Sequence, residues 1–136
     1  MRAFLAALIL CLFLPSVSFA KHRHHHFSHH RTIRYAGEIV SHPAGCPRVS
    51  FCGCGVALKV FGHAVRSLWL AANWYRFPRS SPAAGNVAIF GRHHVAYIIA
   101  AHGDGTATLY DPNSGHHLTR IHRVSLRGAV VVAPRG

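Results

Sequence analysis

The chain has 136 residues, enough for one domain with a modest core. Fifteen lysines and arginines face three acidic residues, which gives a net charge of +12 with neutral histidine. This charge favours polyanionic partners, but the chain has no nucleic-acid-binding motif and begins with the export signal described next, so nucleic acid is not the expected partner.

Residues 1–20 have the pattern of a secretory signal peptide. Arg2 gives a positive start, residues 3–15 form an apolar run, and Ser18 and Ala20 supply the small residues that signal peptidase reads. We predict cleavage after Ala20 and a periplasmic or extracellular location. No later apolar stretch is long enough to cross a bilayer, so no stable membrane anchor is expected after cleavage.

Residues 21–34, KHRHHHFSHHRTIR, form a basic, histidine-rich segment of low complexity. Such a composition cannot bury a core and predicts disorder. Clustered imidazoles allow weak binding of zinc, nickel or copper, and their protonation near pH 6 would strengthen adhesion to anionic polymers. No metal is expected to be required. The histidines of this segment are His22, His24, His25, His26, His29 and His30.

Residues 35–136 are predicted to form a single domain that starts with a loop and a helix. Turn signals such as His42-Pro43 and Cys46-Pro47 predict a loop over 35–50. Apolar residues then recur at helical spacing over 53–77, and Pro78 would end that helix. Gly62 is a candidate position for a bend or a break.

The periodicity changes after residue 85. Short apolar or β-branched runs alternate with glycine-containing turns, which predicts an antiparallel meander of about five strands. A helix followed by a run of strands indicates an α+β fold in which the helix packs on a small sheet. The predicted strands cover residues 87–90, 95–101, 106–110, 118–124 and 129–133.

Removal of the signal peptide leaves three cysteines, Cys46, Cys52 and Cys54. An odd number in an exported protein leaves at least one thiol unpaired within the monomer. Cys52 and Cys54 lie at the start of the predicted helix, where free N–H groups and the helix dipole lower the pKa of a thiol. The pattern fits one disulfide plus one reactive thiol.

A histidine and a polar turn are expected to meet this thiol. His94 opens one predicted strand, and the turn that contains Asp111 and Asn113 follows the next strand. The start of one strand lies beside the end of its antiparallel neighbour, so these groups should share one edge of the sheet. A thiol, an imidazole base and a group that orients the base are what nucleophilic cysteine chemistry needs.

These segments together resemble the papain-like CHAP and NlpC-type cysteine amidohydrolases and peptidases of bacterial cell walls, over roughly residues 46–133. The resemblance is carried by Phe51-Cys52-Gly53, by the segment PAAGNVAIF at 82–90 and by HVAYI at 94–98. It implies a papain-like fold whose N-terminal helix carries the cysteine. Three departures are Asn86 in place of the usual aspartate, Arg92-His93 before the histidine where glycine is common, and Gly53-Cys54 where an aromatic residue usually follows the cysteine.

By position, the resemblance implies Cys52 as the nucleophile and His94 as the base. Asn113 is the first choice for the orienting group and Asp111 is its rival. Cys54 is the rival nucleophile. We favour a Cys46–Cys54 disulfide with Cys52 free, and a Cys46–Cys52 disulfide with Cys54 free is the alternative.

The sequence therefore predicts an exported cysteine hydrolase that cleaves amide bonds in peptidoglycan, as an amidase or an endopeptidase, without a cofactor. The alternative is a non-catalytic wall-binding or metal-binding protein on the same fold. A zinc site is less favoured, because its ligand spacing does not form two close pairs; it would use His42, Cys46, Cys52 and Cys54. The histidines expected at the surface are His63, His102, His116, His117 and His122.

Overall fold

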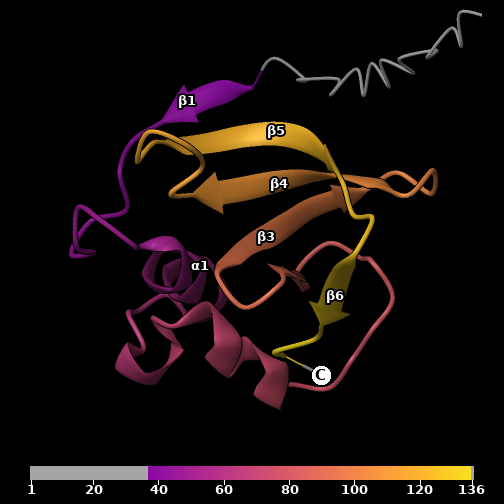
Figure 1. Cartoon of the computed structure of the whole chain (residues 1–136), viewed down its shortest axis with the longest axis horizontal. Coiled ribbons are helices and arrows are strands. Elements are labelled where there is room, and N and C mark those ends of the chain that lie inside the picture. Colours follow the sequence, from indigo (N-terminus) through magenta and orange to yellow (C-terminus); the bar gives the residue numbers. More distant parts are fainter. Residues whose placement is uncertain (1–36, 136) are drawn as a thin grey trace, which may run out of the picture. The chain divides into compact units, whose positions relative to one another are not determined.

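A computed structural model describes residues 37–135, all within one compact unit. The predicted signal peptide and the histidine-rich segment lie outside the described residues. The described part has a mixed α+β fold with one α-helix, two 3-10 helices and a single sheet of six antiparallel strands (Figure 1). None of its helices is long and apolar enough to cross a membrane.

The sheet follows the predicted strands closely but is not a simple five-stranded meander. Its order is β1-β5-β4-β3-β2-β6, so β2 to β5 are consecutive neighbours. The strands are β1 (Glu38–Val40), β2 (Val87–Phe90), β3 (His94–Ala101), β4 (Thr106–Pro112), β5 (Thr119–Ser125) and β6 (Ala129–Val132).

Two edge strands account for the difference. β1 lies within the segment predicted to be a loop and pairs with β5. β6 does not pair with β5; the chain crosses the sheet so that β6 pairs with β2 at the opposite edge (Figure 1). β6 is held there by burial on both faces, because Val131 and Val132 pack into two different apolar clusters.

The long helix predicted over 53–77 is interrupted. α1 spans Cys52–Phe61 and ends at Gly62, whose left-handed backbone (φ 78°) lets its N–H bond the carbonyl of Leu58 at 2.9 Å. Glycine tolerates this conformation at the end of a helix. Two 3-10 helices follow, η1 (Arg66–Leu68) and η2 (Ala71–Arg76).

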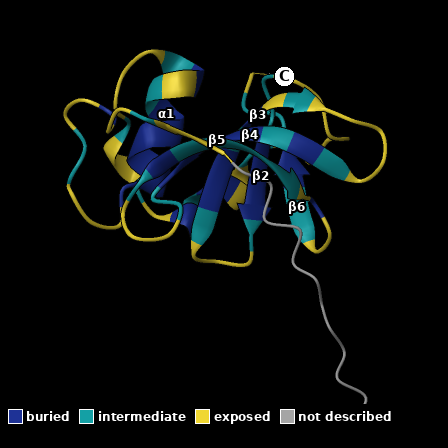
Figure 2. Ribbon diagram, turned by 90° about the horizontal axis from the view of Figure 1, so that it is seen from above, coloured by how far each residue is buried: buried dark blue, intermediate teal, exposed yellow. Residues whose placement is uncertain are grey.

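The core lies on both faces of the sheet. One cluster joins α1 and the 3-10 helices to β2, β3 and β6, with Trp74 fully buried among Val56, Val60 and Val87. The second cluster is built by strand residues and Leu126. Figure 2 shows buried residues on the strands and α1, and exposed residues mainly in the connecting loops. The first cluster fixes α1 against the start of β3, where the candidate site lies.

Candidate active site

Cys52 is the first residue of α1 and the free cysteine of the described part. The carbonyl of Phe51 accepts the N–H of Gly55 at 2.9 Å, but within the described residues no side chain caps this helix end and no acidic residue lies in the first turn. The unpaired N–H groups therefore keep their partial positive charge next to the thiol. Cys52 is 4% exposed.

Cys54 forms a disulfide with Cys46, the pairing that we favoured from the sequence. The alternative Cys46–Cys52 bridge is therefore wrong, and so is Cys54 as a rival nucleophile. The zinc interpretation fails for the same reason, because two of its four proposed ligands are bonded to each other. The bridge also ties the loop before α1 to the first turn of the helix.

Two glycines alternate with these cysteines, and each allows a close approach. A Cβ atom on Gly53 would lie 2.2 Å from the carbonyl oxygen of Leu68 and 2.5 Å from that of Trp69. A Cβ atom on Gly55 would lie 2.7 Å from Cβ of Pro112. Since real Cβ atoms do not approach other atoms so closely, only glycine lets the start of α1 contact both the η1 segment and the end of β4. The Cys-Gly-Cys-Gly pattern is thus a packing requirement.

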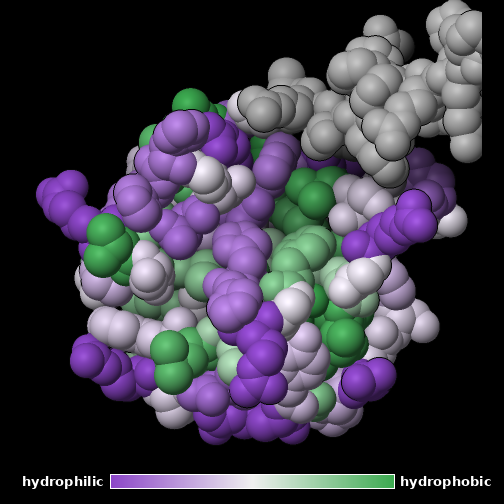
Figure 3. Space-filling model, in the orientation of Figure 1, coloured by the Kyte–Doolittle hydropathy of each residue, from purple (hydrophilic) through white to green (hydrophobic). Residues whose placement is uncertain are grey.

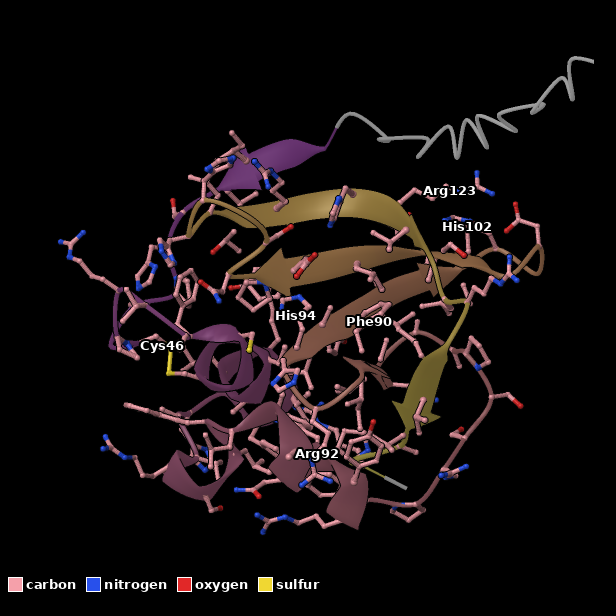
Figure 4. The ribbon with its side chains drawn as sticks, viewed as in Figure 1. Cys46, Phe90, Arg92, His94, His102 and Arg123 are labelled. Carbon is pink, nitrogen blue, oxygen red and sulfur yellow. A yellow bond between two sulfur atoms is a disulfide. The ribbon has the colours of Figure 1, made fainter. Side chains whose placement is uncertain are left out.

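His94 is the first residue of β3 and lies between α1 and the sheet (Figure 4). Its Nε2–H donates to Oδ1 of Asp111 at 2.6 Å. The Cys52 thiol and the His94 imidazole also interact, since each shifts the pKa of the other. A further contact of the Cys52 thiol, at 3.8 Å, is to the carbonyl oxygen of His93. Cys52, His94 and Asp111 therefore form a chain of interacting groups, in which the thiol and the imidazole shift each other's pKa and the imidazole is hydrogen-bonded to the carboxylate.

Asp111 holds a second imidazole as well. Its Oδ2 accepts a hydrogen bond from Nε2–H of His122 at 2.7 Å, so each carboxylate oxygen is paired with one histidine. The Asp111 side chain is 9% exposed and that of His122 is 19% exposed. A carboxylate bonded through both oxygens cannot rotate freely, which fixes Oδ1 toward His94.

The register of the strands explains why Asp111 occupies this position. Tyr97 pairs with Tyr110, and Leu109 pairs with His122. Asp111 is therefore a diagonal neighbour of both His94 and His122 on one face of the sheet. Diagonal side chains at this spacing are within reach of long or aromatic residues.

Asn113, the first choice as orienting group, does not contact His94. β4 ends at Pro112, and Asn113 adopts a left-handed turn conformation (φ 65°) in which its Oδ1 accepts a hydrogen bond from Nδ1–H of His117 at 3.0 Å. The prediction of Asn113 was wrong because the strand stops one residue before it. Its rival Asp111 occupies the orienting position.

The pKa values follow from these contacts. Burial raises the pKa of Cys52, but the hydrogen bond and charge of His94 and the N–H groups of Val95 and Gly53 outweigh burial and bring it below its ordinary value of 9.0. Burial lowers the pKa of His94, but its bonds to Asp111 and Cys52 raise it to about 10. Both directions favour a thiolate–imidazolium pair.

The pKa of Asp111 falls in the same network. Burial would raise it, but hydrogen bonds from His122 and His94 and the positive charge on His94 bring it to about 2. The carboxylate is therefore ionised at any pH at which the protein is expected to work, and it accepts hydrogen bonds from both rings.

Cys52 lines an open groove of about 360 Å³. Its walls come from the segment before α1, from the η1–η2 connection and from the turn between β2 and β3. The residues are Ser50, Cys52, Trp69, Leu70, Ala71, Ala72, Arg92, His93 and Asn113. Cys52 is the member of the Cys52–His94–Asp111 chain that lines this groove. Asn113, although not an orienting group, borders the same groove.

Sequence reasoning missed His122, which was predicted to lie at the surface but is partly buried against Asp111. Alternation of side chains along β5 could predict which face of the sheet His122 lies on. That His122 lies next to Asp111 follows only when the β4–β5 register is known. The other four histidines predicted at the surface are exposed, namely His63, His102, His116 and His117. Among residues 37–135, no group of three or more His, Cys, Asp or Glu is arranged to hold a metal ion.

Comparison with known proteins gave no assignment. No protein-family model matches this chain. No curated protein matches it either.

Proposed function

We propose that this protein is an exported, papain-like cysteine hydrolase that cleaves amide bonds in peptidoglycan, of the CHAP or NlpC type. The observation that carries the proposal is the His94–Asp111 hydrogen bond of 2.6 Å next to a free Cys52 at the start of a helix, with the thiol and the imidazole shifting each other's pKa. The helix start, the lowered thiol pKa and the adjoining groove support it, because a nucleophilic cysteine needs an activated sulfur, a base and space for an acyl group.

The reaction would proceed through an acyl-enzyme. The Cys52 thiolate attacks the amide carbonyl, and the carbonyl oxygen gains negative charge beside the free N–H groups of the first helical turn. Protonated His94 gives a proton to the nitrogen of the leaving amine, and the C–N bond breaks to leave a thioester on Cys52. His94 then takes a proton from water, which attacks the thioester and releases a carboxylic acid and the thiolate.

Two of the three departures from the family pattern, at Gly53 and Asn86, have local explanations. Gly53 replaces an aromatic residue because the carbonyls of Leu68 and Trp69 fill the space that a side chain would need. Asn86 replaces an aspartate, and its amide donates to Ser80 Oγ at 3.1 Å and to the carbonyl of Ser81 at 3.0 Å, which holds the loop before β2. Neither departure removes a group from the Cys52–His94–Asp111 chain.

The test is digestion of purified peptidoglycan by the exported chain, residues 21–136, followed as loss of turbidity and as release of new amino groups. Cys52→Ala and His94→Ala should each abolish the activity while circular dichroism and the thermal midpoint stay close to those of the parent. His102→Ala is the matched control, because this exposed histidine lies at the far end of the sheet (Figure 4). Full activity in Cys52→Ala would refute the proposal.

A non-catalytic binding protein is distinguished by the reactivity of the thiol. A thiolate held by an imidazolium reacts with iodoacetamide near pH 6, whereas an ordinary thiol needs a pH near its own pKa. Slow alkylation of Cys52 at pH 6, together with retained binding to peptidoglycan, would favour the binding protein.

A further inference from the structure

Two backbone contacts, one on each side of Arg92, hold the turn that joins β2 to β3 beside the groove. The hydroxyl of Tyr75 donates to the carbonyl of Gly91 at 2.6 Å, and the carbonyl of His93 lies 3.8 Å from the Cys52 sulfur. The pairing of Phe90 with His94 closes the hairpin. Arg92, in the middle of this turn, lines the same groove as Cys52.

Arg92 differs from the other arginines near this wall. Arg66 stacks on the ring of Trp69, with its guanidinium carbon 4.1 Å from the ring centroid. Arg76 donates to the backbone carbonyls of Asn73 and Ser67. Arg92 is exposed and forms no hydrogen bond or ion pair with another residue among 37–135.

No carboxylate in the described part is placed to neutralise Arg92. Asp111 is occupied by His94 and His122, and Asp104 is paired with Arg123 and Thr106 in the turn between β3 and β4. Glu38 lies on β1, the edge strand beyond β5. The residues that line the groove within 37–135 include no acidic side chain. An unpaired guanidinium of this kind can bind a carboxylate of the substrate by donating two parallel N–H hydrogen bonds to it.

We infer that Arg92 forms an anion subsite of this groove, so that the preferred substrate carries a free carboxylate close to the scissile amide. The inference deepens the proposed function and rests on it, since it assumes that Cys52 is the reacting group. Leu70, Ala71 and Ala72 give the groove an apolar part of its wall in addition to the cationic turn. A substrate with one anionic and one small apolar flank fits both walls.

A pair of small alkylating agents tests the subsite without any assumption about the natural substrate. In both iodoacetate and iodoacetamide the Cys52 thiolate forms a bond to the CH₂ carbon and iodide leaves with its electron pair. Only iodoacetate carries a carboxylate. The ratio of the two alkylation rates therefore measures how strongly the site attracts an anion beside the sulfur, and the neutral agent corrects for changes in the thiol itself.

Arg92→Gln should lower the iodoacetate-to-iodoacetamide rate ratio by about two- to fivefold, as expected for one exposed ion pair. Arg92→Lys should retain part of the preference for iodoacetate, since lysine keeps the positive charge but lacks the paired N–H donors of the guanidinium. Arg127→Gln is the matched control: it removes the same charge from the exposed turn between β5 and β6 and should leave the ratio unchanged. An equal fall in Arg127→Gln would mean that only net charge matters and would overturn the subsite.

Hydrolysis provides the second readout. Stem peptides with a free carboxylate should lose kcat/KM in Arg92→Gln, whereas the same peptides with that carboxylate amidated should not. If the parent cleaves no peptide but the alkylation ratio responds to Arg92, the proposed substrate is wrong and the anion subsite stands. If the parent cleaves both peptides equally and the ratio does not respond, the subsite is wrong and the hydrolase stands. A Cys52 that reacts with neither agent overturns both.

Discussion

At the scale of single residues, Asp111 controls the charge of the site because it is ionised, buried and bonded to the base. Asp111→Asn keeps the size of the side chain but removes the charge that faces His94. A hydrogen bond to a charged group contributes about 1.5–3 kcal/mol, so kcat/KM should fall by about 10- to 100-fold, since about 1.4 kcal/mol corresponds to a factor of ten. Initial rates on a soluble peptidoglycan fragment measure this loss.

Asn113→Gly is the matched control for that variant. It removes the polar side chain that was the other candidate for the group that orients His94. Glycine tolerates the left-handed backbone that Asn113 adopts. Its kcat should stay close to that of the parent, and any change is expected in KM, because Asn113 also borders the groove. If Asn113→Gly lost as much activity as Asp111→Asn, the assignment of Asp111 as the orienting residue would be incorrect.

The dependence of activity on pH follows from the same contacts. The reactive form pairs thiolate Cys52 with protonated His94, so activity should rise as pH increases through the Cys52 pKa, which is below 9.0. It should fall again as His94 loses its proton at about pH 10. Because Asp111 raises the pKa of His94, Asp111→Asn should move the alkaline limb to lower pH. A full kcat/KM profile measures both limbs, and an alkaline limb that stays in place would contradict the network.

The sequence predicted that Cys52 and His94 lie close together, because one precedes the predicted helix and the other opens a predicted strand, and the family resemblance favoured Cys52 over Cys54. In the structure these two groups do interact, since each shifts the pKa of the other. The resemblance favoured Asn113 over Asp111, and the strand pattern could not correct this choice, because both residues follow the predicted strand 106–110 at two-residue spacing. The choice depends on where β4 ends, which Pro112 and the left-handed turn at Asn113 decide. His122 was missed because its role requires the β4–β5 register.

At the scale of elements, the disulfide gives a test of which thiol is used. The double variant Cys46→Ala, Cys54→Ala should be less stable by about 2–4 kcal/mol, the usual contribution of one disulfide. It should still be alkylated at one thiol, Cys52, since neither bridged sulfur belongs to the Cys52–His94–Asp111 chain. Urea unfolding and mass mapping of the labelled residue measure the two effects. Loss of labelling in a variant that remains folded would mean that the bridge, too, sets the geometry of the thiol.

The sequence predicted the strands more accurately than the helix. Four consecutive strands were predicted well because glycine-containing turns separate their apolar runs. The helix over 53–77 was predicted too long, since Gly62 ends α1 while Trp74 and Phe77 return to the same core through 3-10 turns. The ring centroids of Trp74 and Phe77 lie 5.7 Å apart. Apolar residues therefore continue at helical spacing beyond Gly62, although the α-helix itself ends there. β1 was missed because it has three mostly exposed residues and gains its hydrogen bonds only from β5.

At the scale of the whole molecule, the excess of positive charge is not neutralised internally. Of the three carboxylates, Asp111 is used within the site and Asp104 pairs with Arg123. Hydrophilic residues run across the middle of the face seen in Figure 3, with apolar residues on either side. Because fifteen lysines and arginines face these three acids, the chain is expected to be attracted to an anionic polymer, which would raise the rate of encounter.

This charge predicts that attachment and catalysis respond differently to salt. Between about 0.1 M and about 1 M salt the screening length falls from about 10 Å to about 3 Å, so the fraction of Cys52→Ala protein bound to insoluble peptidoglycan should decrease strongly. The inactive variant is used so that binding is measured without digestion. Hydrolysis of a short, uncharged peptide by the parent should change little over the same range, because the His94–Asp111 contact is short and both Cys52 and Asp111 are buried. Binding that resists salt would instead indicate recognition of a specific wall component by the groove.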